Sequence, residues 1–183
     1  YALGGTWSRT ELTLDFLGPR AAVELDGLYL AGEQQLSDVH LDIRHAVPGC
    51  ASHSRYKGVL YGRARAVFDG RIEVGAGADK SDAHLHNDNL LLSRNAEVET
   101  KPQLEIYADD VQCSHGATVG QLDQAQLFYL RSRGIAEAEA RRLLCLGFAA
   151  EVLQRCAIGP LRERVEAGVS RRLAQATDIT GEG

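Results

Sequence analysis

The residues with the greatest chemical potential lie in one short stretch, residues 107–116, which reads YADDVQCSHG. Alternation along a strand places Val111, Cys113 and His115 on one face, with successive side chains of that face about 6.6 Å apart. A thiolate and an imidazole at this spacing can converge on a soft metal ion or an iron–sulfur cluster. The pair also suits a Cys–His nucleophile dyad, although the sequence assigns no third group to orient it. A core cysteine beside a capping histidine is the remaining alternative.

Other histidines and cysteines give weaker signals. His84 and His86 share one face of a predicted strand, as two metal ligands could. A second group occupies a stretch that favours loops, and its members are His40, His45, Cys50 and His53. We interpret both groups as solvated surface side chains. Cys145 and Cys156 fall on an apolar helix face, so we expect them to be buried structural cysteines.

The nearest approach to a phosphate-binding loop is GAGADKS at residues 75–81. Asp79 stands where the motif requires a glycine before the lysine, and its carboxylate would repel a phosphate. We therefore expect a turn between strands. The sequence contains neither a GxGxxG dinucleotide motif after a strand nor a GxSxG nucleophile elbow. It predicts no nucleotide hydrolysis by this chain.

Composition narrows the class of protein. The chain has 183 residues, a formal net charge of -5, 44% hydrophobic and 25% charged residues, and no methionine, values typical of a globular protein. Bulk acidity argues against general nucleic-acid binding, which needs a basic face. No apolar run reaches the roughly 18 residues of a membrane span, and the four cysteines form no CxxC pair. We expect a soluble cytoplasmic protein and, because no methionine opens the chain, a fragment or processed product.

Short runs from Leu12 to about Leu122 alternate apolar and polar residues, as in VHLDI at 39–43. A period of two is typical of half-buried strands. Short Asp- and Asn-containing motifs, such as LDG at 25–27 and FDG at 68–70, recur at intervals near 20 residues and suggest the rungs of a solenoid. A two-sheet sandwich would give much the same strands, so this pattern leaves a parallel β-helix and a sandwich open.

The character of the sequence changes at Asp123. Asp123 followed by Gln126 resembles a capping box, and Gly134 stands where a helix would end. Two further helices are expected after it. We therefore divide the chain into a β domain, a helical domain and a flexible tail, at residues 1–122, 123–176 and 177–183.

The second predicted helix covers about residues 136–157. Its broad apolar face combines two neighbouring stripes, made of Leu143, Gly147, Ala150 and Leu153 and of Leu144, Phe148 and Val152. The third helix begins at Gly159 and Pro160, because proline is well accommodated in a first turn. Its apolar residues recur every four positions, at Leu161, Val165, Val169 and Leu173.

Residues 95–120, NAEVETKPQLEIYADDVQCSHGATVG, resemble the SufB/SufD family of iron–sulfur cluster assembly proteins, and most closely its SufD branch. Three shorter motifs continue the resemblance, namely RAVFDG at 65–70, NDNLLL at 87–92 and LFYLRSRGI at 127–135. The match covers roughly residues 55–157 and, more loosely, both ends of the chain.

The resemblance implies a mainly β fold, with a right-handed parallel β-helix followed by a C-terminal α-helical domain, and further chain upstream of Tyr1. It implies a scaffold subunit without catalytic activity, which pairs with a SufB homologue through the β-helix and docks the SufC ATPase through the helices. A transient iron–sulfur cluster would be assembled at the SufB–SufD interface. Matching the family's Cys-Ser-His-Gly motif assigns cluster or metal binding to His115, with Cys113 beside it. We expect no resident cofactor in the isolated chain, which could form a homodimer.

Large aromatic and arginine side chains dominate the energetics of protein interfaces. The side chains that we expect to dock the ATPase are Phe128, Tyr129, Arg133 and Phe148. Phe148 suits packing between helices equally well.

The alternative function is a carbohydrate-active β-helix enzyme that uses Asp88, Asp109 and Asp110 as acid and base. Sugar sites usually stack their substrates on aromatic rings, and only 6% of the residues here are aromatic.

Overall fold

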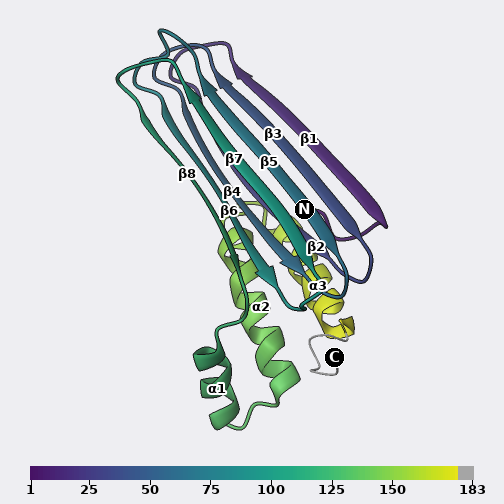
Figure 1. Ribbon diagram of the computed structural model, residues 1–183. Helices are drawn as coiled ribbons and strands as arrows, with labels where there is room; N and C mark the ends of the chain where they lie inside the picture. Colours follow the sequence, from purple (N-terminus) through teal and green to yellow (C-terminus); the bar gives the residue numbers. More distant parts are fainter. Residues whose placement is uncertain (177–183) are drawn as a thin grey trace.

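The computed structural model describes residues 1–176, which form eight strands followed by three helices (Figure 1). The strands are β1 (Trp7–Phe16), β2 (Ala22–Ala31), β3 (Leu36–His45), β4 (Ala51–Leu60), β5 (Arg65–Val74), β6 (Asp82–Leu91), β7 (Glu97–Ile106) and β8 (Gln112–Gly120). The helices are α1 (Gln124–Ser132), α2 (Glu137–Leu153) and α3 (Gly159–Gln175). The tail predicted at 177–183 lies outside the described residues.

The strands build a parallel β-solenoid of about four turns. Odd-numbered strands form one sheet in the order β1-β3-β5-β7, and even-numbered strands form the other in the order β2-β4-β6-β8. Each strand from β1 to β6 pairs in parallel with the strand two further along the chain. A sandwich of consecutive antiparallel strands is therefore excluded, and the expected parallel β-helix is confirmed.

The expected repeat of about 20 residues is wrong. Trp7 pairs with Leu36 and Arg65 with Glu97, so the offsets between coils are 29 and 32 residues. Each coil is this long because it contains two strands of about ten residues and two turns. The LDG and FDG motifs lie in β2 and β5, which belong to different sheets, so their spacing does not measure a coil.

Alternation along each strand sorts the side chains between the interior and the surface. In β5 the buried positions alternate with partly or fully exposed ones, and Phe68 and Ile72 point inward with no exposed area. The inward side chains of all coils stack into one continuous core between the two sheets. Residues 75–81, which resemble a phosphate loop, form the expected turn between β5 and β6.

The first helix begins as predicted. The Asp123 carboxylate accepts a hydrogen bond from the backbone N–H of Ala125 at 2.8 Å, which caps α1. Gly134 follows the helix with a φ of 88°, a left-handed conformation that glycine adopts without strain. None of the described helices is long and apolar enough to cross a membrane.

Helices α2 and α3 cover the outer face of the even-numbered sheet near the carboxyl ends of its strands. A second core joins Leu28, Val59 and Leu90 of the sheet to buried side chains of the helices, among them Cys145, Ala149, Val152, Val165, Val169 and Leu173. The buried positions predicted for Val165, Val169 and Leu173 are confirmed, whereas Leu161 is 40% exposed.

The predicted extent and apolar face of the second helix need correction. Helix α2 ends at Leu153, and its buried side combines Ala140, Cys145 and Ala149 with Val152 and Leu153, while Leu143 is exposed. Small side chains on the buried side allow close packing against the sheet.

Beyond α2, the Arg155 guanidinium donates a hydrogen bond to the Asp26 carboxylate at 3.0 Å.

The two cysteines expected on this helix have different environments. Cys145 is buried as predicted. Cys156 lies beyond the end of α2 and is only partly buried, so its predicted burial on a helix face is wrong.

Replacement of a central ring should test the continuous core. In the full-length protein we expect Phe68→Ala to lower the free energy of unfolding by about 3–5 kcal/mol, because it leaves a cavity between the sheets. Leu17, which is 88% exposed, provides the control: Leu17→Ala should change this free energy by less than about 0.5 kcal/mol. Urea unfolding measures the free energy of unfolding of both variants. Equal effects of the two substitutions would contradict a continuous, closely packed core.

Candidate functional site

The last coil of the solenoid has open edges. Among the described residues β7 pairs only with β5 and β8 only with β6, because the chain leaves the solenoid after β8 and enters α1 (Figure 1). One side of each strand therefore presents unpaired backbone N–H and C=O groups. Tyr107 before β8 and Val119 near its end are 63% and 50% exposed. This open end can accept further strands.

Cys113 and His115 occupy inward positions at this open end. In register, Cys113 pairs with Ala83 and His115 with Leu85, and both partners are completely buried in the core. Alternation had placed these two side chains on one face, and the structure does the same. Because no described coil covers them, His115 is exposed and Cys113 is half-buried.

The surroundings of Cys113 favour the neutral thiol. Burial raises the pKa of Cys113, and the Asp82 carboxylate acts in the same direction, while a backbone hydrogen bond with Ala83 opposes them. A nucleophilic cysteine needs a lowered pKa. Among the described residues no hydrogen bond orients the His115 ring, so the geometry does not supply the third group of a nucleophile dyad. Cys113 and His115 are better suited to receive a metal or a partner's ligand at the coil's open end.

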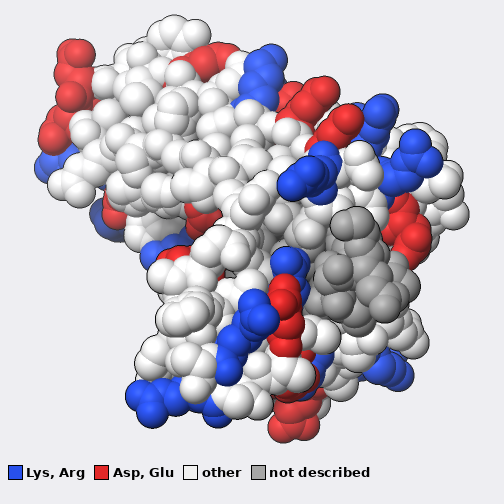
Figure 2. All heavy atoms as spheres, turned by 60° about the horizontal axis from the view of Figure 1, so that its bottom comes forward, with Lys and Arg blue, Asp and Glu red and all other residues white. Residues whose placement is uncertain are grey.

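The aromatic side chains expected at an interface divide into two groups. Phe128 and Tyr129 on α1 are 73% and 56% exposed, and the Arg133 guanidinium lies 5.3 Å from the centre of the Tyr129 ring. Phe148 on α2 is half-buried against the second core, with the Lys57 ammonium 4.1 Å from its ring centre. Figure 2 shows acidic and basic side chains interspersed over the helical end of the molecule. Among the described residues of the helices and their connections, the α1 rings are the exposed aromatic pair, and Ile158 before α3 is also 61% exposed.

Comparison with known proteins identifies the family. The model of the SUF system FeS cluster assembly SufBD core domain matches residues 1–148. The chain belongs to the SufBD family. It is similar to the iron–sulfur cluster assembly protein SufD of Escherichia coli (strain K12), with 39% identity over 94% of this chain and 41% of that protein. A SufBD family protein of Mycobacterium leprae is 38% identical over 93% of this chain and 46% of its own length.

A chloroplast relative is also similar. Protein ABCI7 of Arabidopsis thaliana is 37% identical over 83% of this chain and 32% of its own length. The chain thus spans less than half the length of these SufBD relatives. The predicted family, whose model describes SUF-system FeS cluster assembly, is confirmed.

The four residues assigned to a loop-prone stretch do not converge, and the expectation of loops is wrong. His40 and His45 lie in β3 and His53 in β4, while Cys50 is buried in the turn between these strands. His45 is also not at the surface: it is 1% exposed, its Nε2 lies 2.8 Å from the Ser52 hydroxyl, and burial lowers its pKa.

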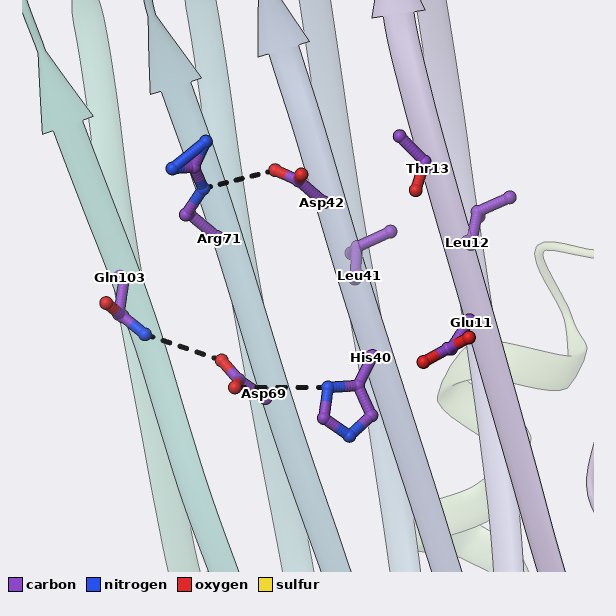
Figure 3. Close-up of a pocket in the computed structure, with 9 residues that line it drawn as sticks. All are labelled: Glu11, Leu12, Thr13, His40, Leu41, Asp42, Asp69, Arg71 and Gln103. Atoms are coloured by element: carbon purple, nitrogen blue, oxygen red, sulfur yellow. Dashed lines mark hydrogen bonds and ion pairs between the residues drawn. The ribbon is translucent and has the colours of Figure 1, made fainter.

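The outer face of the odd-numbered sheet carries a ladder of polar pairs (Figure 3). Arg71 donates to the Asp42 carboxylate at 3.2 Å, and Gln103 donates to that of Asp69 at 3.4 Å. His40 Nδ1 lies 3.9 Å from Asp69. These polar side chains pair with one another across neighbouring strands, which stabilises the surface of the sheet. Their pairing singles out none of them as a candidate functional residue.

Asp88 does not share a site with the other two carboxylates of the alternative enzyme. Asp82 pairs with Gln112 and Asp88 with Thr118, while Asp110 lies in the turn before β8. Asp88 is therefore separated from Asp109 and Asp110 by at least six strand positions, or about 20 Å. Acid and base carboxylates of glycosidases lie within about 5–10 Å of each other.

Sequence analysis missed one group of possible ligands. Ligand atoms of His53, Asp82 and His84 all lie within 4.8 Å of one another on the outer face of the even-numbered sheet. His53 is 29 residues before Asp82, so the grouping is invisible without the register of β4 and β6. A repeat of about 30 residues, had it been recognised, would have aligned His53 with His84.

The raised pKa of Cys113 can be tested by alkylation. Because the thiolate fraction is reduced, we expect its rate of reaction with iodoacetamide to rise with a midpoint above the value of about 8.5 found for peptide cysteines. At neutral pH, Cys113 should therefore react with iodoacetamide more slowly than the cysteine of a synthetic control peptide. Peptide-resolved mass spectrometry of the full-length protein over a pH series provides the measurement. A synthetic peptide of residues 109–117 is the control, and a midpoint at or below that of the peptide would contradict this environment.

Proposed function

We propose that this chain forms the core and helical part of a SufD-type scaffold subunit, which pairs with a SufB homologue through the open last coil. The observation that carries this proposal is the exposed β-edge that holds Cys113 and His115 at inward positions. The subunit binds and positions; it contributes no catalytic step of its own. We further propose a right-handed coil, the hand of nearly all parallel crossovers, and action in the cytoplasm.

Strand addition is the physical basis of the pairing. An unpaired strand edge offers a row of main-chain donors and acceptors to a second chain. Two open solenoid ends that meet would satisfy these groups and also cover each other's inward side chains. His115, exposed in the isolated chain, would then lie at the junction between two cores. A second copy of this chain could use the same edge, which supports a homodimer when no SufB homologue is present.

The cluster at this junction is the cargo of the assembly. A neutral imidazole is a good ligand for iron and can also hold a neighbouring thiolate of the partner. Cys113 must lose a proton before it binds metal, and its raised pKa makes that loss harder. We therefore assign the main ligand role to His115 and a lesser one to Cys113.

The C-terminal helices are the proposed docking surface for the SufC ATPase. Phe128, Tyr129 and Arg133 form one exposed aromatic and cationic group on and just after α1. Such side chains are typical anchors of interfaces. Phe148 belongs at the margin of this surface, since it already packs under Lys57. The ATPase would thus act on the scaffold from the helical end.

The ligand role of His115 has a direct test. In the full-length subunit, coexpressed with its SufB and SufC homologues, we expect His115→Ala to slow cluster formation by more than about tenfold. Removal of a residue that only supports a metal ligand already lowers activity by about 10–100-fold, and removal of a ligand should cost at least as much. Assembly of the complex and its melting temperature should change little, because the side chain is exposed in the isolated chain. Absorbance of the reconstituted cluster and size-exclusion chromatography provide the two readouts.

Cys113→Ser is the matched control for His115→Ala, and we expect a smaller effect on the rate. Cluster formation at the wild-type rate by the His115→Ala complex would refute the site. Failure of that complex to assemble would instead show that His115 is structural.

Docking of the ATPase can be tested with side chains that the core does not need. We expect the double substitution Phe128→Ala and Tyr129→Ala to weaken binding of SufC by about 30-fold or more, because a hot-spot aromatic contributes at least about 2 kcal/mol. Surface plasmon resonance with the full-length subunit measures the affinity. Leu17→Ala removes another exposed apolar side chain and should leave it unchanged. Undiminished affinity of the double variant would exclude this surface.

A further inference from the structure

We propose that His53, Asp82 and His84 form a binding site for a divalent transition-metal ion on the outer face of the even-numbered sheet, separate from the coil's open end. Parallel register places His53 directly beside His84 on the neighbouring strand, and Asp82 precedes His84 by two residues on the same face. All three side chains are half-buried. Ligands from two adjacent strands are therefore held on a rigid surface.

The distances within this His53–Asp82–His84 site fit a single ion. The Asp82 carboxylate lies between the two rings, with Oδ2 3.1 Å from Nε2 of His53 and Oδ1 2.7 Å from Nε2 of His84. Zinc ligands at about 2.0–2.1 Å in a tetrahedral arrangement lie about 3.3 Å from one another. All the ligand atoms lie within 4.8 Å of one another, so a shared ion would need to draw them closer together. Because the site lies on the outer face of the sheet, water could complete the coordination.

One carboxylate oxygen is unsatisfied by hydrogen bonding. Asp82 Oδ1 is buried and has no hydrogen-bond partner among the described residues, and its 2.7 Å contact with Nε2 of His84 is an ion pair only when that ring is protonated. A buried carboxylate oxygen without a donor is costly. A cation held between Oδ1 and the imidazole would remove that cost.

Ser114 provides the support that a ligating histidine normally has. Its hydroxyl lies 2.5 Å from Nδ1 of His84 on the neighbouring strand. When Nε2 binds a metal, Nδ1 carries the proton and donates it to such an oxygen, which fixes the tautomer and the orientation of the ring. His84 is therefore oriented for ligation by Nε2, the atom that already faces Asp82.

The ligand set indicates the class of metal. Two imidazoles and one carboxylate match zinc, iron(II), cobalt(II) and nickel(II), whereas calcium and magnesium prefer oxygen ligands only. The site contains no thiol. Cys113 belongs to the opposite, inward face of the same sheet, because its register partner Ala83 is in the core.

Titration of the full-length protein with zinc and cobalt(II) tests the site. We expect isothermal titration calorimetry to show one zinc ion bound at this site. The His84→Gln substitution should lower the zinc affinity by more than about 100-fold, and Ser114→Ala should lower it by about 10–100-fold. Bound cobalt(II) should give visible d–d bands without the intense near-ultraviolet absorption of a cobalt–thiolate bond. His86→Gln is the matched control, because His86 lies on the same face of β6 outside the trio and should leave affinity unchanged.

Two results would overturn the proposal. They are an absence of zinc binding by the wild-type protein and a zinc affinity of the His84→Gln variant within twofold of the wild-type value. Melting temperatures recorded in chelator confirm that each variant is folded before titration, and His53→Gln serves as the second ligand variant if His84→Gln does not fold. Cluster formation is a separate readout, so loss of the zinc site leaves the role proposed for His115 intact.

Discussion

The structure depends on one constraint, the parallel register that stacks each coil on the one before it. Trp7 lies against Leu36 and Leu36 against Arg65, and every inward side chain falls into a column with its counterparts in neighbouring coils. The apolar interior is therefore continuous along the solenoid, and each coil covers the one before it. A coil at an end lacks this cover on one side. The exposure of Cys113 and His115 arises from that lack, since their register partners Ala83 and Leu85 are completely buried in the preceding coil.

Buried polar groups add specificity to this stacking. Asn87 donates to the Tyr29 hydroxyl at 3.1 Å, Asn89 donates to Asn87 at 2.7 Å, and Thr100 donates to Asn87 at 2.9 Å. The network lies inside the solenoid and joins both sheets, because Tyr29 and Asn87 belong to the even-numbered sheet and Thr100 to the odd-numbered one. A shift of the strand register by one residue would place these polar groups against apolar neighbours and leave them without hydrogen-bond partners. Burial raises the pKa of Tyr29, so its hydroxyl remains a neutral donor within the network.

Sequence patterns predict the local elements well and the register poorly. Alternation at residues 39–43 identifies a strand, and the Asp123 cap and Gly134 mark both ends of α1, because each signal acts within a few residues. The motifs recur in strands of both sheets, so their spacing is shorter than the length of a coil. The predicted stripes of α2 include the buried Val152 and Leu153 but miss the small buried residues of this helix. Its small residues Cys145 and Ala149 matter only because they pack in the core that joins the helices to a sheet.

The same distinction explains which parts of the candidate sites were predictable. Cys113 and His115 are two residues apart on one strand, so alternation alone brings them to one face. His53 reaches Asp82 and His84 only through the pairing of β4 with β6. Register thus connects the two faces of the even-numbered sheet: Ser114, which supports His84 on the outside, lies between Cys113 and His115 on the inside. Strand addition at β8 would fix the backbone of all three residues, so a partner that covers His115 would also hold Ser114 in place beneath the His84 ring.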